Sequence, residues 1–206
     1  MPFDALTQQE RARAQAIGSV SRREQFLAGR WLAKTMLAEV QGGAPEDWKI
    51  DAHAHAKPRV IGHDLQLSIS HSGPLVACCI ADRAVGIDIE GFDRARPVAE
   101  MASLVCSEHE QSSLRPLHVD ALTQRFFQLW TAKEARLKQL GASFDIGALR
   151  AIQMAPSERS KAHAGTWCFL GQQKVMLSLA VEDMSCVSVR WPADWVAGPM
   201  QWHTYI

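Results

Sequence analysis

The chain twice places one long helical segment ahead of several short strands, and this repeated order constrains its fold more than any other feature. The first long segment runs from Ser21 to about Val40 and stops at Gly42, and the second runs from His118 to Gly141. Glycine directly after the last periodic residue is a common helix terminator. The order predicts an α+β fold of two similar halves, each a long helix packed on a mainly antiparallel sheet of short strands.

A short internal repeat supports this duplication. Four residues of the first helical region align without gaps on identical residues of the second: Trp31, Ala33, Lys34 and Gly42 align on Trp130, Ala132, Lys133 and Gly141. Four identities in so short a window suggest a pseudo-twofold duplication. We therefore expect a first α+β half over residues 1–95 and a second over residues 96–206.

The predicted strands are short and close together along the chain. LQLSIS (65–70) alternates apolar and polar residues, LVACCIA (75–81) follows an SHSGP turn, and VGIDIE (85–90) follows a tight turn. This spacing predicts an antiparallel meander. In the second half, TWCFL (166–170), KVMLSLAV (174–181) and SCVSVRW (185–191) have the same strand character.

Composition narrows the classes of partner. The 22 basic and 22 acidic side chains cancel, so no global field attracts nucleic acid or an anionic membrane, and any anion site must be local. The sequence shows neither a signal-peptide core nor an apolar run of membrane-spanning length, and its five cysteines form no CxxC pair. We expect a cytoplasmic monomer with reduced cysteines that binds neither nucleic acid nor membrane.

Two carboxylates share one face of the predicted strand VGIDIE. Side chains alternate along a strand, so Asp88 and Glu90 point to one side and Ile87 and Ile89 to the other. Paired carboxylates repel each other unless a positive charge lies between them, which favours a divalent cation or a cationic partner. A solvated strand face is the alternative that this motif alone leaves open.

A third carboxylate stands on the apolar stripe of the second long helix. Trp130, Glu134 and Leu137 fall on one face, and burial of a lone ionised glutamate is costly unless it is paired or bound to metal. Glu134 therefore needs a cation. Lys138, one helical turn further on, could supply it as a simple intrahelical ion pair.

Taken together, KP (57–58), SISHSG (68–73), VGIDIE (85–90) and FFQLWTAKEARLKQLG (126–141) resemble the signature set of the 4′-phosphopantetheinyl transferases, specifically the longer pseudo-dimeric type that activates surfactin synthetase. The resemblance runs from about Phe26 to Gly141 in the family's order and spacing. It implies transfer of the phosphopantetheine arm of coenzyme A to a serine of an apo acyl or peptidyl carrier protein, with release of adenosine 3′,5′-bisphosphate.

The resemblance also implies site residues for the metal and the pyrophosphate. Asp88, Glu90 and Glu134 would bind Mg²⁺ or Mn²⁺, and Mg²⁺ prefers such oxygen ligands. Lys138 would contact the pyrophosphate, and Lys133 the same region.

Further positions match the family's contacts with coenzyme A. His71, beside Ser70, would contact a phosphate, whereas Lys57 and Arg30 would hold the 3′-phosphate. Lys34 is the alternative to Arg30 in this alignment.

The sequence allows two interpretations of Glu110, the candidate general base. Ser107 and Glu110 read as a capping box, which alone would account for Glu110. The family alignment instead makes Glu110 the catalytic base, with Glu108 as its neighbour.

Carrier docking is expected beside the second-half helices, where Leu114 and Leu117 are the candidate exposed apolar residues and Arg115 is the charged one.

Two other function classes remain compatible with parts of the sequence. Three carboxylates could serve a metal-dependent phosphoester hydrolase, which would leave SHSG and KP unexplained. A non-catalytic module that binds coenzyme A or a carrier is the second alternative. The sequence does not select the carrier, which could belong to fatty-acid, polyketide or peptide synthesis.

Overall fold

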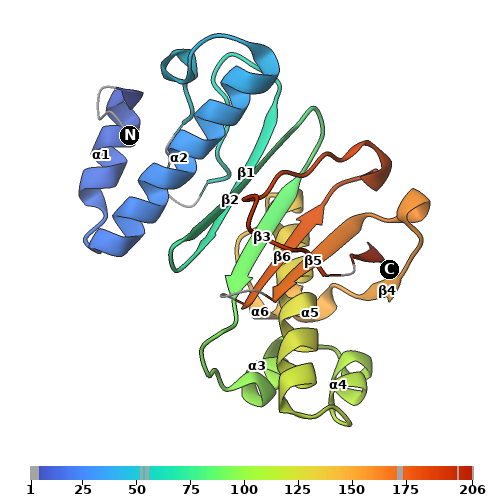
Figure 1. The fold of residues 1–206 in the computed structure, drawn as a ribbon. Helices are drawn as coiled ribbons and strands as arrows, with labels where there is room; N and C mark the ends of the chain where they lie inside the picture. Colours follow the sequence, from blue (N-terminus) through green and yellow to red (C-terminus); the bar gives the residue numbers. More distant parts are fainter. Residues whose placement is uncertain (1–4, 52, 54–55, 171–173, 199, 206) are drawn as a thin grey trace.

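Two helices of 22 residues each, α2 (Val20–Gln41) and α5 (Val119–Leu140), organise the fold (Figure 1). The structure is a computed structural model that describes residues 5–51, 53, 56–170, 174–198 and 200–205. Within these residues α2 packs on a two-stranded antiparallel sheet and α5 on a five-stranded one. The predicted α+β class is confirmed, and the second half carries the larger sheet.

The first half consists of a helical hairpin and one β-hairpin. α1 (Gln8–Ala16) precedes α2, a short 3₁₀ turn η2 (Pro45–Asp47) follows it, and β1 (Gln66–Ser72) pairs with β2 (Leu75–Ala81). Ala33 and Leu37 of α2 are fully buried against Leu67 of β1 and Ile50 of the connecting segment. This apolar cluster fixes the long helix on one face of the hairpin.

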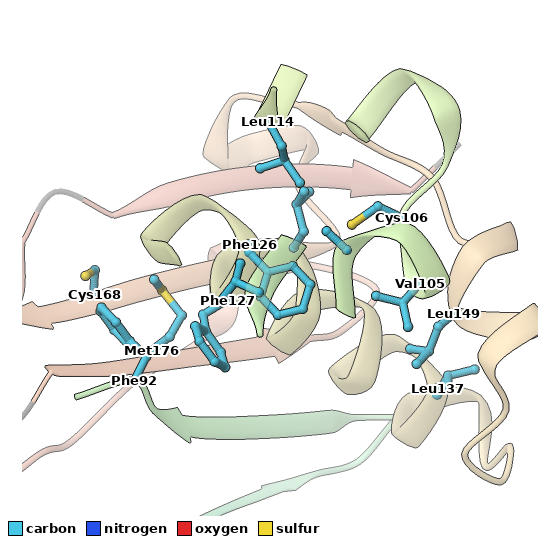
Figure 2. Close-up of a cluster of buried hydrophobic side chains, with 13 residues drawn as sticks. Phe92, Val105, Cys106, Leu114, Phe126, Phe127, Leu137, Leu149, Cys168 and Met176 are labelled. Atoms are coloured by element: carbon cyan, nitrogen blue, oxygen red, sulfur yellow. The ribbon is translucent and has the colours of Figure 1, made fainter. Parts of the chain in front are cut away.

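The second half surrounds α5. Its elements are β3 (Gly86–Gly91), α3 (Val98–Val105), α4 (Glu108–Leu114), α5, α6 (Ile146–Ala151), β4 (Met154–Pro156), η3 (Arg159–Lys161), β5 (Ala164–Leu170), β6 (Lys174–Ala180), η4 (Met184–Cys186) and β7 (Gln201–Tyr205). The sheet order is β3-β6-β5-β7-β4. Figure 2 shows Phe126 and Phe127 of α5 in the buried cluster that α3, α4 and α6 complete. Among the described residues, no helix has both the length and the apolar character to cross a membrane.

The strand β3 does not continue the hairpin as a meander, so that expectation is wrong. Its backbone pairs with β6 in an antiparallel ladder that joins Gly86 to Ala180 and Gly91 to Val175. The strand thus lies in the sheet of the second half, although it precedes residue 95. The boundary at residue 95 remains a prediction.

Close packing of β3 on α5 depends on Gly86. A Cβ atom at this position would overlap the carbonyl oxygen of Ala135 and the backbone nitrogen of Gln139. The missing side chain lets the strand approach the helix at backbone distance. The carboxylates two and four residues further along β3 are thereby held against the helix that carries Glu134.

Two further sequence expectations fail in the second half. SCVSVRW was expected as a strand, but residues 184–186 form the turn η4 and residues 187–191 are irregular. Leu114 was expected on the surface, but it is buried in the α5 cluster because α4 turns its apolar side inward (Figure 2). Leu117 is partly buried against the same cluster, and Arg115 is exposed.

Candidate active site

Three serine hydroxyls join the two halves where β1 lies beside β3. The backbone N–H groups of Ile87, Ile89 and Gly91 donate to the hydroxyls of Ser68, Ser70 and Ser72 at 3.1, 3.3 and 3.1 Å. The partners advance together along both strands, so β1 and β3 run parallel (Figure 1). Side chains thus satisfy backbone donors that a continuous sheet would pair with carbonyls. We call the contact between residues 68–72 of β1 and residues 87–91 of β3 the seam.

Asp88 lies buried at the seam and has one occupied and one free oxygen. Its Oδ1 accepts from the hydroxyl of Ser70 at 2.8 Å and from the ammonium of Lys138 at 2.7 Å. The same ammonium donates to Ser70 at 2.9 Å. The other oxygen, Oδ2, is buried and has no hydrogen-bond partner among the described residues. An unpaired buried carboxylate oxygen is costly, so this atom is suited to a cation.

Glu90 is held in a similar way at the end of the seam. Its Oε2 accepts from the hydroxyl of Ser72 at 2.7 Å and from the guanidinium of Arg96 at 3.3 Å. Arg96 also lies over the ring of Phe127, 5.1 Å from its centroid. Partial burial raises the pKa of Glu90, and the hydrogen bond from Ser72 opposes this shift.

Glu134 on α5 is close enough to both strand carboxylates to feel their charge. Partial burial and the negative charge of Asp88 raise the pKa of Glu134 to about 7, with a smaller contribution from Glu90, while the ammonium of Lys138 opposes the rise. The intrahelical pair of Glu134 with Lys138, which the sequence left open as an alternative, is not formed, because Lys138 bonds to Asp88 instead. Asp88 and Glu90 thus lie at the seam, and Glu134 lies near enough on α5 for their charges to raise its pKa.

Asp88 is the carboxylate at the seam with an oxygen that could serve a divalent cation. In the part of the chain that the structure describes, no group of three His, Cys, Asp or Glu side chains is arranged so that it could hold a metal ion. Two observations favour a cation here: Oδ2 of Asp88 has no partner among the described residues, and the pKa of Glu134 is raised by partial burial first and by the charge of Asp88 second. Mg²⁺ commonly takes only one or two carboxylates and keeps waters, so an open set of oxygens suits it.

Glu110 and Lys133 form a separate buried ion pair. The ammonium of Lys133, which is 0% exposed, lies 2.6 Å from Oε2 of Glu110 and also donates to the carbonyls of Val105 and Leu149. Glu110 completes the predicted capping box with Ser107. Lys133 and Lys138 are five residues apart on α5, which turns them about 140° from each other. Lys133 therefore faces α3, α4 and α6 rather than the seam.

A cavity of about 640 Å³ lies on the other side of β1, between that strand and the first two helices. Arg13, Arg22, Arg30, Phe26 and His71 are among its lining residues. Arg13 and Arg22 had not been predicted, because their spacing alone does not distinguish them from solvated helix charges. Three guanidinium groups around one cavity make it suited to phosphate groups.

Of the two candidates Arg30 and Lys34, Arg30 is the one that lines this cavity. Arg30 is 7% exposed, one of its terminal nitrogens is buried without a partner among the described residues, and burial lowers its pKa. Lys34 is fully buried in an ion pair with Glu10 at 2.9 Å. Arg30 therefore keeps one guanidinium nitrogen unpaired within the described residues, whereas the ammonium of Lys34 is engaged in an ion pair.

The other predicted contacts lie around the same strand. Lys57 precedes the lining residue Pro58, and partial burial lowers its pKa. His71 is an exposed residue of the cavity wall. Partial removal of its ring from solvent lowers its pKa, and the positive charge of Lys138 lowers it further. Along β1, Ser70 and Ser72 face the seam while Ile69 and His71 face the cavity. One strand thus separates the phosphate-suited cavity from the carboxylates.

Comparisons with known proteins agree on one family. Residues 84–185 match the family described as the 4′-phosphopantetheinyl transferase superfamily. The chain is 30% identical to the 4′-phosphopantetheinyl transferase HetI of Nostoc sp. over 96% of its own length and 83% of that protein. It is 30% identical to the 4′-phosphopantetheinyl transferase Sfp of Bacillus subtilis over 58% of its length and 53% of that protein.

Similarity also extends to a shorter aligned region of another transferase and to a solved structure. The chain is 34% identical to the 4′-phosphopantetheinyl transferase AcpT of Escherichia coli over 59% of its length and 60% of that protein. A holo-(acyl-carrier-protein) synthase from Bacillus anthracis, solved in complex with CoA (3′,5′-ADP), aligns with a TM-score of 0.38 and 19% identity. That alignment covers 47% of this chain and 91% of the synthase chain.

Proposed function

The chain belongs to the 4′-phosphopantetheinyl transferase superfamily and is an enzyme of that type, and we propose that it transfers the phosphopantetheine arm of coenzyme A to a serine of an apo carrier protein. The released product is adenosine 3′,5′-bisphosphate. The observation that carries this proposal is the seam, where three carboxylates and Lys138 lie beside a strand whose other face lines the arginine-rich cavity.

The cavity is the proposed site of the adenosine and its 3′-phosphate. Arg30 offers the buried unpaired nitrogen, Arg13 and Arg22 add charge, and Lys57 lies beside the lining residue Pro58. Phe26 provides an aromatic wall, over which the Arg30 guanidinium already lies at 5.1 Å. Coenzyme A bound here would extend its pyrophosphate past His71 toward the seam.

At the seam, Asp88, Glu90 and Glu134 are the proposed holders of Mg²⁺, with Mn²⁺ as the alternative. When bound, the ion neutralises negative charge on the pyrophosphate oxygens. Ser70 and Lys138 hold Asp88 in place through its Oδ1, so Oδ2 keeps its orientation. Lys138 is 30% exposed, and its ammonium can also donate to a phosphate oxygen as charge develops on the leaving group.

The proposed general base is Glu110, against the alternative that it only caps α4 and neutralises Lys133. The family resemblance supports the base role, together with an Oε1 atom that has no partner among the described residues. Burial of Glu110, at 6% exposure, and its short bond to Lys133 support the structural role. A base must come within hydrogen-bond reach of the carrier serine, so the two roles make different kinetic predictions.

The proposed function is tested by the dependence of product formation on the carrier. The protein is incubated with coenzyme A and Mg²⁺, with and without an apo carrier, and adenosine 3′,5′-bisphosphate is quantified. A transferase forms the bisphosphate only when the carrier is present, in equal amount to the holo carrier. Bisphosphate without carrier would identify a hydrolase, and coenzyme A binding without any product would identify a binding module.

The carrier itself is found by comparing specificity constants across a panel. Apo carriers from fatty-acid, polyketide and peptide synthesis are used with one preparation of the enzyme. A carrier preferred by at least tenfold in kcat/KM identifies the physiological class. Equal values across the panel would identify a broad-specificity enzyme.

A further inference from the structure

The seam contains two serines that each bind a strand carboxylate and one serine that does not. Ser70 donates to Asp88 and Ser72 donates to Glu90. Ser68 accepts the N–H of Ile87 in the same way, but no carboxylate contact of its hydroxyl occurs among the described residues. The seam therefore contains its own control for any effect of losing a hydroxyl between β1 and β3.

The hydroxyl proton of Ser72 is directed at Glu90. A serine hydroxyl has one proton and two lone pairs. The N–H of Gly91 donates to this oxygen at 3.1 Å, which occupies a lone pair from the β3 side. The hydroxyl proton remains for the 2.7 Å bond to Oε2 of Glu90. The backbone of β3 thus orients the group that holds its own carboxylate.

Both donors to Glu90 act on the same oxygen. Arg96 reaches Oε2 at 3.3 Å and is itself anchored by the carbonyl of Gly91 at 3.1 Å. Among the described residues no hydrogen bond or ion pair reaches Oε1 of Glu90. Asp88 repeats this pattern, with Ser70 and Lys138 on Oδ1 and nothing on Oδ2.

From this geometry we propose that Ser72 is a positioning residue for Glu90, which holds one carboxylate oxygen so that the other is presented to the metal ion. The inference rests on the proposed function, because it takes Glu90 as a ligand. Partners that fix a ligating carboxylate through its non-ligating oxygen typically change metal affinity by roughly 10- to 100-fold when removed. Ser72 touches neither the metal nor coenzyme A in this account.

The test measures metal binding directly, with Mn²⁺ as the probe. Wild type, Ser72→Ala, Ser68→Ala and Ser72→Thr are each titrated with Mn²⁺ in the presence of coenzyme A, and free Mn²⁺ is followed by electron paramagnetic resonance. Ser72→Ala should raise the Mn²⁺ dissociation constant about tenfold. Ser72→Thr keeps a hydroxyl on a β-branched residue suited to strands and should restore affinity to near the wild-type value.

The control variant separates positioning from loss of a seam hydrogen bond. Ser68→Ala removes an N–H acceptor between the same strands and should leave the dissociation constant within about twofold, since no ligand is touched. Equal weakening in Ser68→Ala and Ser72→Ala, or no weakening in Ser72→Ala, would overturn the proposal. If Ser72→Ala does not fold by circular dichroism, Ser72→Cys replaces it, because a thiol of similar size is a much weaker donor.

Glu90→Gln distinguishes this inference from the function on which it rests. Weak binding in Glu90→Gln with normal binding in Ser72→Ala would contradict only the positioning role. Normal Mn²⁺ binding in Glu90→Gln, or no binding by the wild type, would contradict the proposed metal site itself.

Discussion

The ammonium nitrogen of Lys138 lies 2.7 Å from Oδ1 of Asp88 and 2.9 Å from the hydroxyl of Ser70. One side chain of α5 thus contacts both strands of the seam. The side chain spans the junction between the two halves, so its contacts hold that junction together and neutralise one of three neighbouring carboxylates. This relationship links stability and proposed chemistry at the same residue.

Replacement of Lys138 by Met should affect both properties. The Asp88 carboxylate loses its charged partner, and we expect the free energy of unfolding to fall by about 1–2 kcal/mol, a value reduced by the partial exposure of Lys138. Loss of one charged donor at a phosphoryl-transfer site should lower kcat roughly 100-fold. Urea unfolding and steady-state kinetics measure the two effects.

A double-mutant cycle is the control for the Lys138 prediction. Asp88→Asn should lower the free energy of unfolding less in the Lys138→Met background than in the wild type. In the double variant, neither charge of the pair is left without its partner. Strict additivity of the two changes would show that the pair is not coupled.

The close approach of β3 to α5 gives a sharp comparison between two glycines of one strand. Gly86→Ala should destabilise the protein by about 3 kcal/mol, because the added methyl group meets backbone atoms of α5 that cannot move aside independently. At Gly91 the nearest contact of an added Cβ would be Oδ1 of Asp93 at 3.7 Å, an ordinary distance. Gly91→Ala should stay within about 0.5 kcal/mol of wild type. Similar thermal midpoints for both variants would contradict the packing described here.

Glu110→Gln separates the structural role of this residue from its proposed catalytic one. The buried ammonium of Lys133 loses its counterion, so the free energy of unfolding should fall by about 3 kcal/mol in either case. As the general base, Glu110 should in addition contribute a kcat effect of roughly 100-fold or more. Kinetics at a temperature where the variant remains folded decide the question, and an unchanged kcat would leave Glu110 as a helix cap only.

The raised pKa of Glu134, about 7, predicts how stability depends on pH without divalent cations. Between about pH 4.5 and 7 the folded protein keeps a proton on Glu134 that the unfolded chain has released. Because the folded state then binds more protons, the free energy of unfolding should fall as pH rises through this window, by about 1–3 kcal/mol. Urea denaturation at several pH values measures the slope.

Glu134→Gln is the matched control for this pH dependence, because it keeps the shape and removes the titration. Its stability should decline less between pH 4.5 and 7 than that of wild type. Identical slopes for the two proteins would show that the pKa of Glu134 is not raised in the folded protein.

Local signals allowed much of the site to be predicted from the sequence. Alternation along β3 correctly put Asp88 and Glu90 on one face, and glycine correctly ended α5 at Gly141. The interruption of an apolar helix stripe singled out Glu134. Each of these inferences depends on residues within one turn or one strand, where periodicity is informative.

What could not be predicted depends on contacts between distant segments. Pairing of β3 with β6 joins residues 86–91 to residues 175–180, and no local pattern specifies that choice. Lys133 and Lys138 look equivalent in sequence, but packing buries one against Glu110 and leaves the other at the seam. The hydrogen bond from Ser72 to Glu90 could not be predicted either, because the alternation of serines in SISHS does not reveal which strand they face.

We propose that the carboxylates at the seam between the halves support phosphopantetheine transfer. The most direct measurement is the intact mass of an apo carrier after incubation with coenzyme A and Mg²⁺, for wild type and for Glu134→Gln with verified fold and coenzyme A binding. We predict that the wild type adds one phosphopantetheine mass per carrier and that Glu134→Gln slows this addition by at least 100-fold. Modification by Glu134→Gln at the wild-type rate, or no modification of any carrier by the wild type, would contradict the account.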